Sequence, residues 1–178
     1  MYISGSKGRC AKLLSVGQLV VYGIHGVCKI AGTEVRTVDR KKVEYYVVEP
    51  VSQAGACFFV PSGNPVAVGK LRPILSKAEL DALFSDLSNW KDVWVAEENQ
   101  RKQHYRELIS GGDRKSLLSM ILALQAHRVA QQEAGRKFHL CDENFLRDAQ
   151  RLLCMEIAVI LETDEPGALS YLQKHING

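Results

Sequence analysis

Apolar and polar positions alternate in the first part of the chain and recur at helical spacing in the second. In the first part, short runs rich in Val, Tyr and Phe are separated by glycine, proline and other turn residues, which is the pattern of β-strands. Their close spacing, with no helix between them, predicts a small closed β-barrel. The strands are expected over 18–23, 26–35, 42–50, 56–61 and 70–74.

From Ser76 onward apolar residues recur every three or four positions, which predicts amphipathic helices. Ser76 and Glu79 form the S-x-x-E pattern of a capping box at the start of the first helix. Asp113 and Asp142 are expected to cap two later helices. The helices are expected over about 76–87, 92–109, 114–133 and 142–161, with a short final helix that starts at 163–165 and ends at about Ile176.

The predicted fold class is therefore α+β, with an N-terminal β-barrel followed by an all-helical bundle of about five helices. We expect an N-terminal lead over residues 1–14, the barrel domain over 15–75 and the helical domain over 76–178. A barrel of this size has a thin core, so docking against the helical part is expected to support it.

Charge is unevenly distributed along the chain. The formal net charge of the whole chain is +3, whereas residues 1–75 carry +6. Residues 101–137 carry +5 between flanking segments of −4 each. A basic island of this kind is compatible with a surface that faces phosphate groups, and also with an ordinary solvated helix face.

The sequence carries no motif typical of an enzyme, a metal site or a membrane protein. Gly-rich phosphate loops, nucleophile elbows and H-E-x-x-H patterns are all absent from it. Its five cysteines include no C-x-x-C pair, which favours reduced thiols over a zinc site or a disulfide framework. No apolar run approaches the length of a membrane span. We expect a cytoplasmic protein without catalytic activity, cofactor or small-molecule substrate.

One stretch near the N-terminus has a distinctive sequence. It reads G-Q-L-V-V-Y-G-I-H-G-V from Gly17 to Val27, and further landmarks follow in order at Tyr45–Val48, Val60–Pro61, Val68–Ile74 and Ser110–Asp113. Together they resemble the CarD/CdnL family of bacterial transcription regulators, the CarD-like/TRCF proteins. The resemblance covers residues 14–162, and Gly23 stands where the family usually has proline.

The resemblance implies that the predicted barrel is a Tudor-like domain that binds the β subunit of RNA polymerase through a strand edge. Arg36 stands where relatives have a basic contact residue. Phe59 stands at another contact position, which is often Arg in relatives. The basic turn that contains Arg40 and Lys41 follows Arg36 and is expected to belong to the same surface.

For the helical part, the resemblance implies contact with promoter DNA that does not depend on sequence. In the family, a Trp early in the long helix wedges into the minor groove at the upstream edge of the melted promoter. Trp94 and Trp90 are the candidates here, and we favour Trp94 because its context is more helical. Core packing remains the alternative for each of them. The basic residues that follow are expected to contact phosphates: Arg101, Lys102 and Arg106.

These observations predict a transcription regulator that binds the RNA polymerase β subunit and stabilises the open promoter complex. The predicted partners are thus RNA polymerase and promoter DNA. A protein–protein adaptor that acts on RNA polymerase without touching DNA is the alternative. Salt sensitivity distinguishes the two, because phosphate contacts weaken as salt rises.

Overall fold

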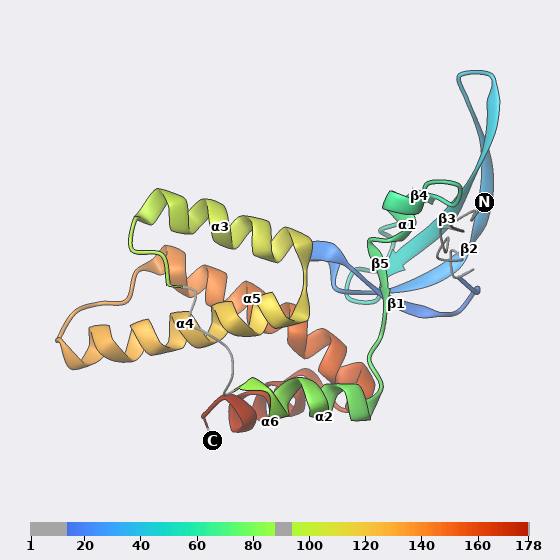
Figure 1. Ribbon diagram of the computed structural model, residues 1–178. Coiled ribbons are helices and arrows are strands. Elements are labelled where there is room, and N and C mark those ends of the chain that lie inside the picture. The colour runs from blue at the N-terminus through green and yellow to red at the C-terminus, as the bar shows by residue number, and fades with distance from the viewer. Residues whose placement is uncertain (1–13, 88–93, 178) are drawn as a thin grey trace, which may run out of the picture.

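A sheet and a group of helices lie side by side in the structure, a computed structural model that describes residues 14–87 and 94–177 (Figure 1). Each part has its own cluster of buried apolar side chains. The larger cluster joins five helices, and the smaller one lies on one face of the sheet. The α+β class and the sheet-then-helices order are thus as predicted.

The strands are joined in one antiparallel sheet in the order β4-β3-β2-β1-β5. Strands lie close to each predicted position, and β2 extends further than expected. Within the described residues β4 and β5 stay at opposite edges of the sheet, so the predicted closed barrel is not formed. The strands are β1 Leu19–Tyr22, β2 Val27–Val38, β3 Lys41–Pro50, β4 Phe58–Pro61 and β5 Leu71–Pro73.

The inner face of the sheet is apolar because strand side chains alternate between faces. Val20, Ile30 and Val48 are fully buried there, and Ile30 lies opposite Val48 in the register of β2 and β3. The register shifts between Ile30 and Gly32, which marks a β-bulge. Beyond this bulge β2 leaves the core, and its residues become exposed. Two short helical elements complete this part: η1 Gly23–His25 and α1 Pro65–Val68.

Five longer helices follow the sheet, and two of them begin as the sequence predicts. The side chain of Ser76 accepts the Glu79 N–H, and the Glu79 carboxylate accepts the Ser76 N–H, so the capping box is confirmed. The Asp113 side chain likewise caps its helix by accepting the Ser116 N–H. The helices are α2 Lys77–Ser85, α3 Glu98–Gly111, α4 Arg114–Glu133, α5 Leu140–Leu161 and α6 Glu165–Asn177.

The starts of α3 and α5 differ from the prediction. Glu97 caps α3 by accepting the N–H groups of Asn99 and Gln100, so Trp94 precedes the helix instead of lying within it. The helix α5 begins at Leu140, which places Asp142 inside its first turn. Asp142 does not act as the cap because its carboxylate is bound by Arg101.

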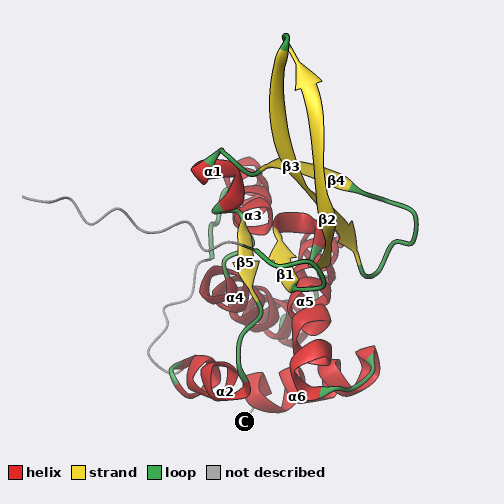
Figure 2. Cartoon of the chain, turned by 90° about the vertical axis from the view of Figure 1, so that its right-hand side faces the viewer, coloured by secondary structure: helices red, strands yellow, loops and turns green. Residues whose placement is uncertain are grey.

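The bundle core is formed mainly by α4 and α5, which lie against each other, with α2 and α6 on one side and α3 on the other (Figures 1 and 2). Leu118, Ile121 and Leu124 of α4 are fully buried, at the helical spacing read from the sequence. From α5, Leu146, Ala149 and Ile157 are buried. The bundle therefore buries the apolar stripes that the spacing predicts.

Candidate functional site

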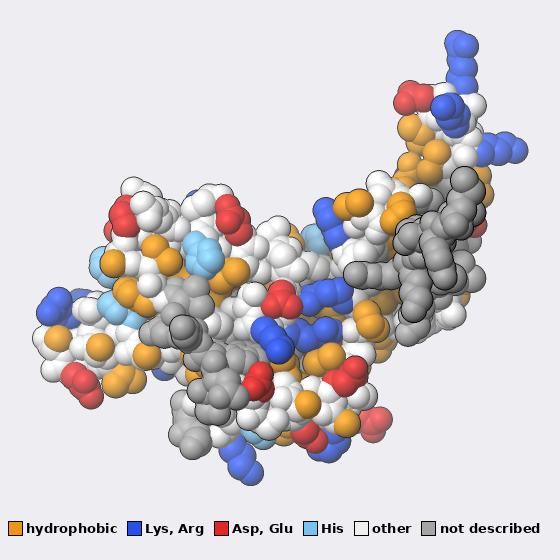
Figure 3. Space-filling model, viewed as in Figure 1, with side chains coloured by type: hydrophobic (Ala, Val, Ile, Leu, Met, Phe, Trp, Pro, Cys, Tyr) orange, Lys and Arg blue, Asp and Glu red, His pale blue; other side chains and the backbone are white. Residues whose placement is uncertain are grey.

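The strands β2 and β3 form a long hairpin that projects away from the rest of the molecule (Figure 2). Asp39 and Arg40 make the two-residue turn, with φ angles of 49° and 63°. Positive φ at both positions is the geometry of a type I′ turn, whose twist matches that of the strands. The predicted contact residues Arg40 and Lys41 therefore lie exposed at the tip, where Figure 3 shows a group of basic side chains.

Two predicted polymerase-contact residues, Arg36 and Phe59, meet on the outer face of the sheet. The Arg36 guanidinium carbon lies 3.4 Å from the centroid of the Phe59 ring. Glu34 forms an ion pair with the same guanidinium, with Nε to Oε1 at 2.9 Å. A cation over an aromatic face is attractive, and both groups remain accessible to a partner here. The sequence placed these two residues in one function without predicting that they touch.

The strand register explains why Arg36 and Phe59 share a face. Arg36 lies opposite Val43, and Phe59 lies opposite Val47, so all four side chains point away from the buried face. We call them the outer-face patch: Arg36, Val43, Val47 and Phe59. The patch borders the outer edge of β4, which pairs only with β3 among the described strands. An unpaired edge beside an accessible aromatic ring is a surface on which another strand can dock.

At the far end of the bundle, Trp94 is only partly buried and packs against the helical core. Its indole stacks on the ring of His127, with centroids 3.6 Å apart and planes 19° apart. The guanidinium carbon of Arg101 lies 4.4 Å from the indole centroid. Trp94 thus combines core packing with partial exposure. Trp90 lies outside the described residues.

The three basic residues predicted to contact phosphates have different environments. Arg101 is only 5 % exposed and forms an ion pair with Asp142, so its guanidinium is not part of the surface. Lys102 pairs with Glu98 one turn earlier on α3. Its hydrogen bond to Glu98 raises the pKa of Lys102. Arg106 is exposed on the same helix. Of these three side chains on α3, Arg106 is therefore the most exposed and the most accessible to a phosphate.

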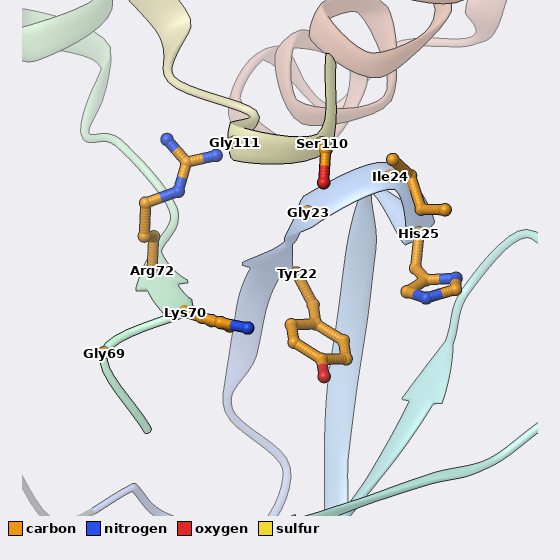
Figure 4. Close-up of a pocket in the computed structure, with 9 residues that line it drawn as sticks. All are labelled: Tyr22, Gly23, Ile24, His25, Gly69, Lys70, Arg72, Ser110 and Gly111. Atoms are coloured by element: carbon orange, nitrogen blue, oxygen red, sulfur yellow. The ribbon is translucent and has the colours of Figure 1, made fainter. Parts of the chain in front are cut away.

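A cavity of about 520 Å³ lies where the sheet meets the bundle (Figure 4). Tyr22 and His25 line it from the sheet side, Lys70 and Arg72 from β5 and its approach, and Ser110 from the end of α3. Arg72 donates a hydrogen bond to the Gly112 carbonyl, which terminates α3. A cation at this position complements the negative end of the helix. Burial lowers the pKa of Arg72, and the nearby Arg114 adds to this effect.

The turn between β1 and β2 lies close to the bundle, and both of its glycines, Gly23 and Gly26, have positive φ. A Cβ at Gly23 would lie 3.4 Å from the Ser110 carbonyl oxygen. At Gly26, where φ is +67°, a Cβ would lie 2.7 Å from the side chain of Met155 in α5. The motif glycine at this position therefore provides both a left-handed turn and contact with the helices.

A buried carboxylate joins the linker after β5 to two helices. Glu156 is 4 % exposed and accepts hydrogen bonds from Arg114 Nε at 2.8 Å and Nη2 at 2.6 Å. The same carboxylate accepts the Leu75 N–H at 3.1 Å, and Arg114 Nη2 also donates to the Pro73 carbonyl at 2.6 Å. Bidentate pairing with further hydrogen bonds is the arrangement that a buried ion pair requires. This junction fixes the path of the chain between sheet and bundle.

Residues 14–74 match the family model of the CarD-like/TRCF RID domain. This chain carries a CarD-like/TRCF RID domain. The match spans β1 to β5, including the hairpin and the outer-face patch. The resemblance to CarD-like proteins is thereby confirmed over residues 14–74.

The RID domain is an RNA polymerase-interacting, protein-binding domain, and its presence indicates a transcription factor associated with RNA polymerase. Of the predicted site residues, Arg36, Arg40, Lys41 and Phe59 lie within the matched residues. Trp94, Lys102 and Arg106 follow the RID domain. In the described parts of the chain, no helix is long and apolar enough to cross a bilayer, and no group of three metal-ligating side chains occurs.

Sequence reasoning missed the side chains that connect the RID domain to the helices and those that surround Trp94. Glu156 and Arg114 carry the first group, and Asp142 and His127 belong to the second. A signal for Glu156 was present, because its position continues the apolar stripe of α5 at helical spacing. A charge in such a stripe is buried, and a buried charge needs a partner. The identity of the partner depends on the fold.

Proposed function

We propose that this protein is a transcription regulator that binds the β subunit of RNA polymerase and stabilises the open promoter complex. In this proposal residues 15–75 bind the polymerase and residues 76–178 contact DNA at the upstream edge of the bubble. The DNA contacts do not read sequence. The observation that carries the proposal is the RID domain match at residues 14–74, together with the outer-face patch beside an unpaired strand edge.

The outer-face patch supports the polymerase contact. Phe59 provides apolar surface next to the β4 edge, and Arg36 covers its ring with a charged group that remains half exposed. A partner strand that pairs with β4 would bring an acidic or polar side chain within reach of Arg36. The basic tip formed by Arg40 and Lys41 would extend the contact further along the hairpin.

The DNA contact is assigned to the end of the bundle that contains Trp94. Its partly exposed indole has the size and stiffness of a wedge at a base step. Arg106 is exposed on α3 and can neutralise phosphates, and Lys102 can do so if it exchanges Glu98 for DNA. Weak contacts suffice because attachment to the polymerase raises the local concentration of the bundle at the promoter.

The junction between the RID domain and the bundle supports this mechanism. Arg114, Glu156 and Arg72 connect the two parts through buried or half-buried polar contacts. A rigid junction places the bundle at a fixed position once the sheet is bound. DNA contacts that form only with the opened promoter then shift the equilibrium towards the open complex.

A protein–protein adaptor that does not touch DNA is the second candidate. The burial of Arg101 and the pairing of Lys102 favour it, because they leave fewer side chains for phosphates than the sequence predicts. The adaptor would still use the outer-face patch. Its binding to polymerase–promoter complexes would depend little on salt.

The deciding experiment measures the lifetime of the open complex with the cognate polymerase, using wild type, Arg36→Glu and Trp94→Ala. We expect wild type to lengthen the lifetime, Arg36→Glu to lose polymerase binding, and Trp94→Ala to bind polymerase without lengthening the lifetime. Lys174→Glu on α6 makes the same charge change as Arg36→Glu at an exposed site and should behave as wild type. Unchanged lifetimes with Trp94→Ala would favour the adaptor. A wild-type protein that does not bind polymerase would refute both candidates.

A further inference from the structure

Four of the five N–H donors of Arg101 have partners inside the protein. Its Nε and Nη2 atoms donate to the two carboxylate oxygens of Asp142 at 3.0 and 3.1 Å. Asp142 is 1 % exposed and Arg101 is 5 % exposed, so this is a buried ion pair. Such a pair persists only when the remaining donors also find partners. Nη1 finds them in the carbonyls of Val95 and Ala96, at 2.9 and 3.2 Å.

Those two carbonyls belong to the segment that connects Trp94 to α3. This segment has no helical hydrogen bonds of its own, because α3 begins only at Glu98. Arg101 therefore fixes the backbone directly after Trp94 and also lies 4.4 Å from its indole. The stack on His127 of α4 provides a further contact for the ring. Trp94 is thus held through contacts to its ring and through the backbone of the two residues that follow it.

We propose that Arg101, anchored by Asp142, is a positioning residue that orients the Trp94 indole for its contact with promoter DNA. This inference rests on the proposed function, in which Trp94 acts at the edge of the bubble. Arg101 itself is not assigned to phosphate, because it is only 5 % exposed and four of its five N–H donors bind Asp142, Val95 and Ala96. Its effect on the promoter passes through the orientation of Trp94.

Arg101→Lys isolates this role. Lysine keeps a positive charge beside Asp142 but lacks the planar fork that reaches a carboxylate and two carbonyls at once. Asp142→Asn is the second variant, since it keeps the shape of the anchor while removing its charge. Arg151→Lys, at an exposed site on α5, is the matched control.

The first readout is the fluorescence of Trp94, measured in the Trp90→Phe background so that Trp94 is the only tryptophan in the chain. We expect Arg101→Lys and Asp142→Asn to raise quenching by acrylamide and to shift the emission to the red, with helical circular dichroism preserved. Arg151→Lys should leave both unchanged. Unaltered quenching in two folded variants would overturn the proposal. If one variant fails to fold, the other decides.

The second readout is a double-mutant cycle on open-complex lifetime. Arg101→Lys should shorten the lifetime when Trp94 is present and change nothing further in the Trp94→Ala background, while affinity for polymerase stays constant. Equal shortening in both backgrounds would overturn the positioning role, because Arg101 would then act independently of Trp94. If Trp94→Ala alone leaves the lifetime unchanged, the proposed DNA contact fails, and the quenching result alone decides whether Arg101 positions the indole.

Discussion

Arg114 Nη2 lies 2.6 Å from Glu156 Oε1, in an ion pair that also binds the backbone of the linker between sheet and bundle. The Glu156 carboxylate accepts hydrogen bonds both from Arg114 of α4 and from the backbone N–H of Leu75 in the linker. The pair therefore connects the RID domain to α4 and α5 through a single carboxylate.

Removing this carboxylate should destabilise the protein strongly. We expect Glu156→Ala to lower the free energy of unfolding by about 3–5 kcal/mol, because it leaves the Arg114 charge partly buried without its partner. Urea unfolding measures the change. Asp148→Ala, at an exposed site on the same helix, should stay within about 0.5 kcal/mol of wild type. Equal effects of the two variants would contradict the role assigned to the junction.

Gly26 is expected to tolerate alanine poorly. Alanine there would have to adopt φ 67° with ψ −137°, a mirror-β conformation that glycine occupies readily, and would displace the flexible end of the Met155 side chain, whereas Gly17 has open space around its Cβ position. Backbone strain should cost each variant about 1–3 kcal/mol, and Gly26→Ala should lose more because its φ and ψ lie further from the conformations that alanine adopts. Thermal unfolding of the two variants compares these contributions. A smaller decrease in stability for Gly26→Ala than for Gly17→Ala would contradict this prediction.

Arg36 and Phe59 should be energetically coupled even in the free protein. A double-mutant cycle with Arg36→Ala and Phe59→Ala should give a coupling of about 0.5–1 kcal/mol in unfolding free energy, as expected for an exposed cation–π contact. Binding to polymerase measured with the same variants should show a larger loss for each. Coupling near zero would mean that the two side chains contribute separately.

The buried thiols should resist alkylation. Burial raises the pKa of Cys28 and that of Cys154 to about 11, so both stay protonated at mildly alkaline pH. Cys57 is exposed. Iodoacetamide at pH 8, followed by mass spectrometry, should therefore label Cys57 well before the two buried thiols. Rapid labelling of Cys28 in the folded protein would contradict the packing of the sheet core.

The same thiols predict a dependence of stability on alkaline pH. A pKa raised in the folded state means that the folded protein holds the proton more tightly than the unfolded chain does. The contribution of Cys28 and Cys154 is thus fully present below the ordinary thiol pKa of 9.0 and decreases as pH rises towards their raised pKa of about 11. Cys154→Ala should weaken this decrease in unfolding experiments over that range.

Local sequence patterns determined most of the secondary structure. Alternating apolar residues located the strands, and the capping residues Ser76 and Asp113 located the starts of two helices, because these features depend on neighbours in the chain. The motif at Gly17–Val27, with the landmarks that follow it, indicated the CarD-like resemblance that the RID match confirms over residues 14–74.

Tertiary structure decided what these patterns could not. The sequence assigned Arg101 to phosphates and Asp142 to a helix cap, whereas the fold brings the two together in one buried pair. It also brings Arg36 to Phe59 and, within the described residues, keeps β4 and β5 at opposite edges of the sheet. A charged side chain has no fixed role in the sequence, since its free energy depends on burial and on the partner that long-range packing places beside it.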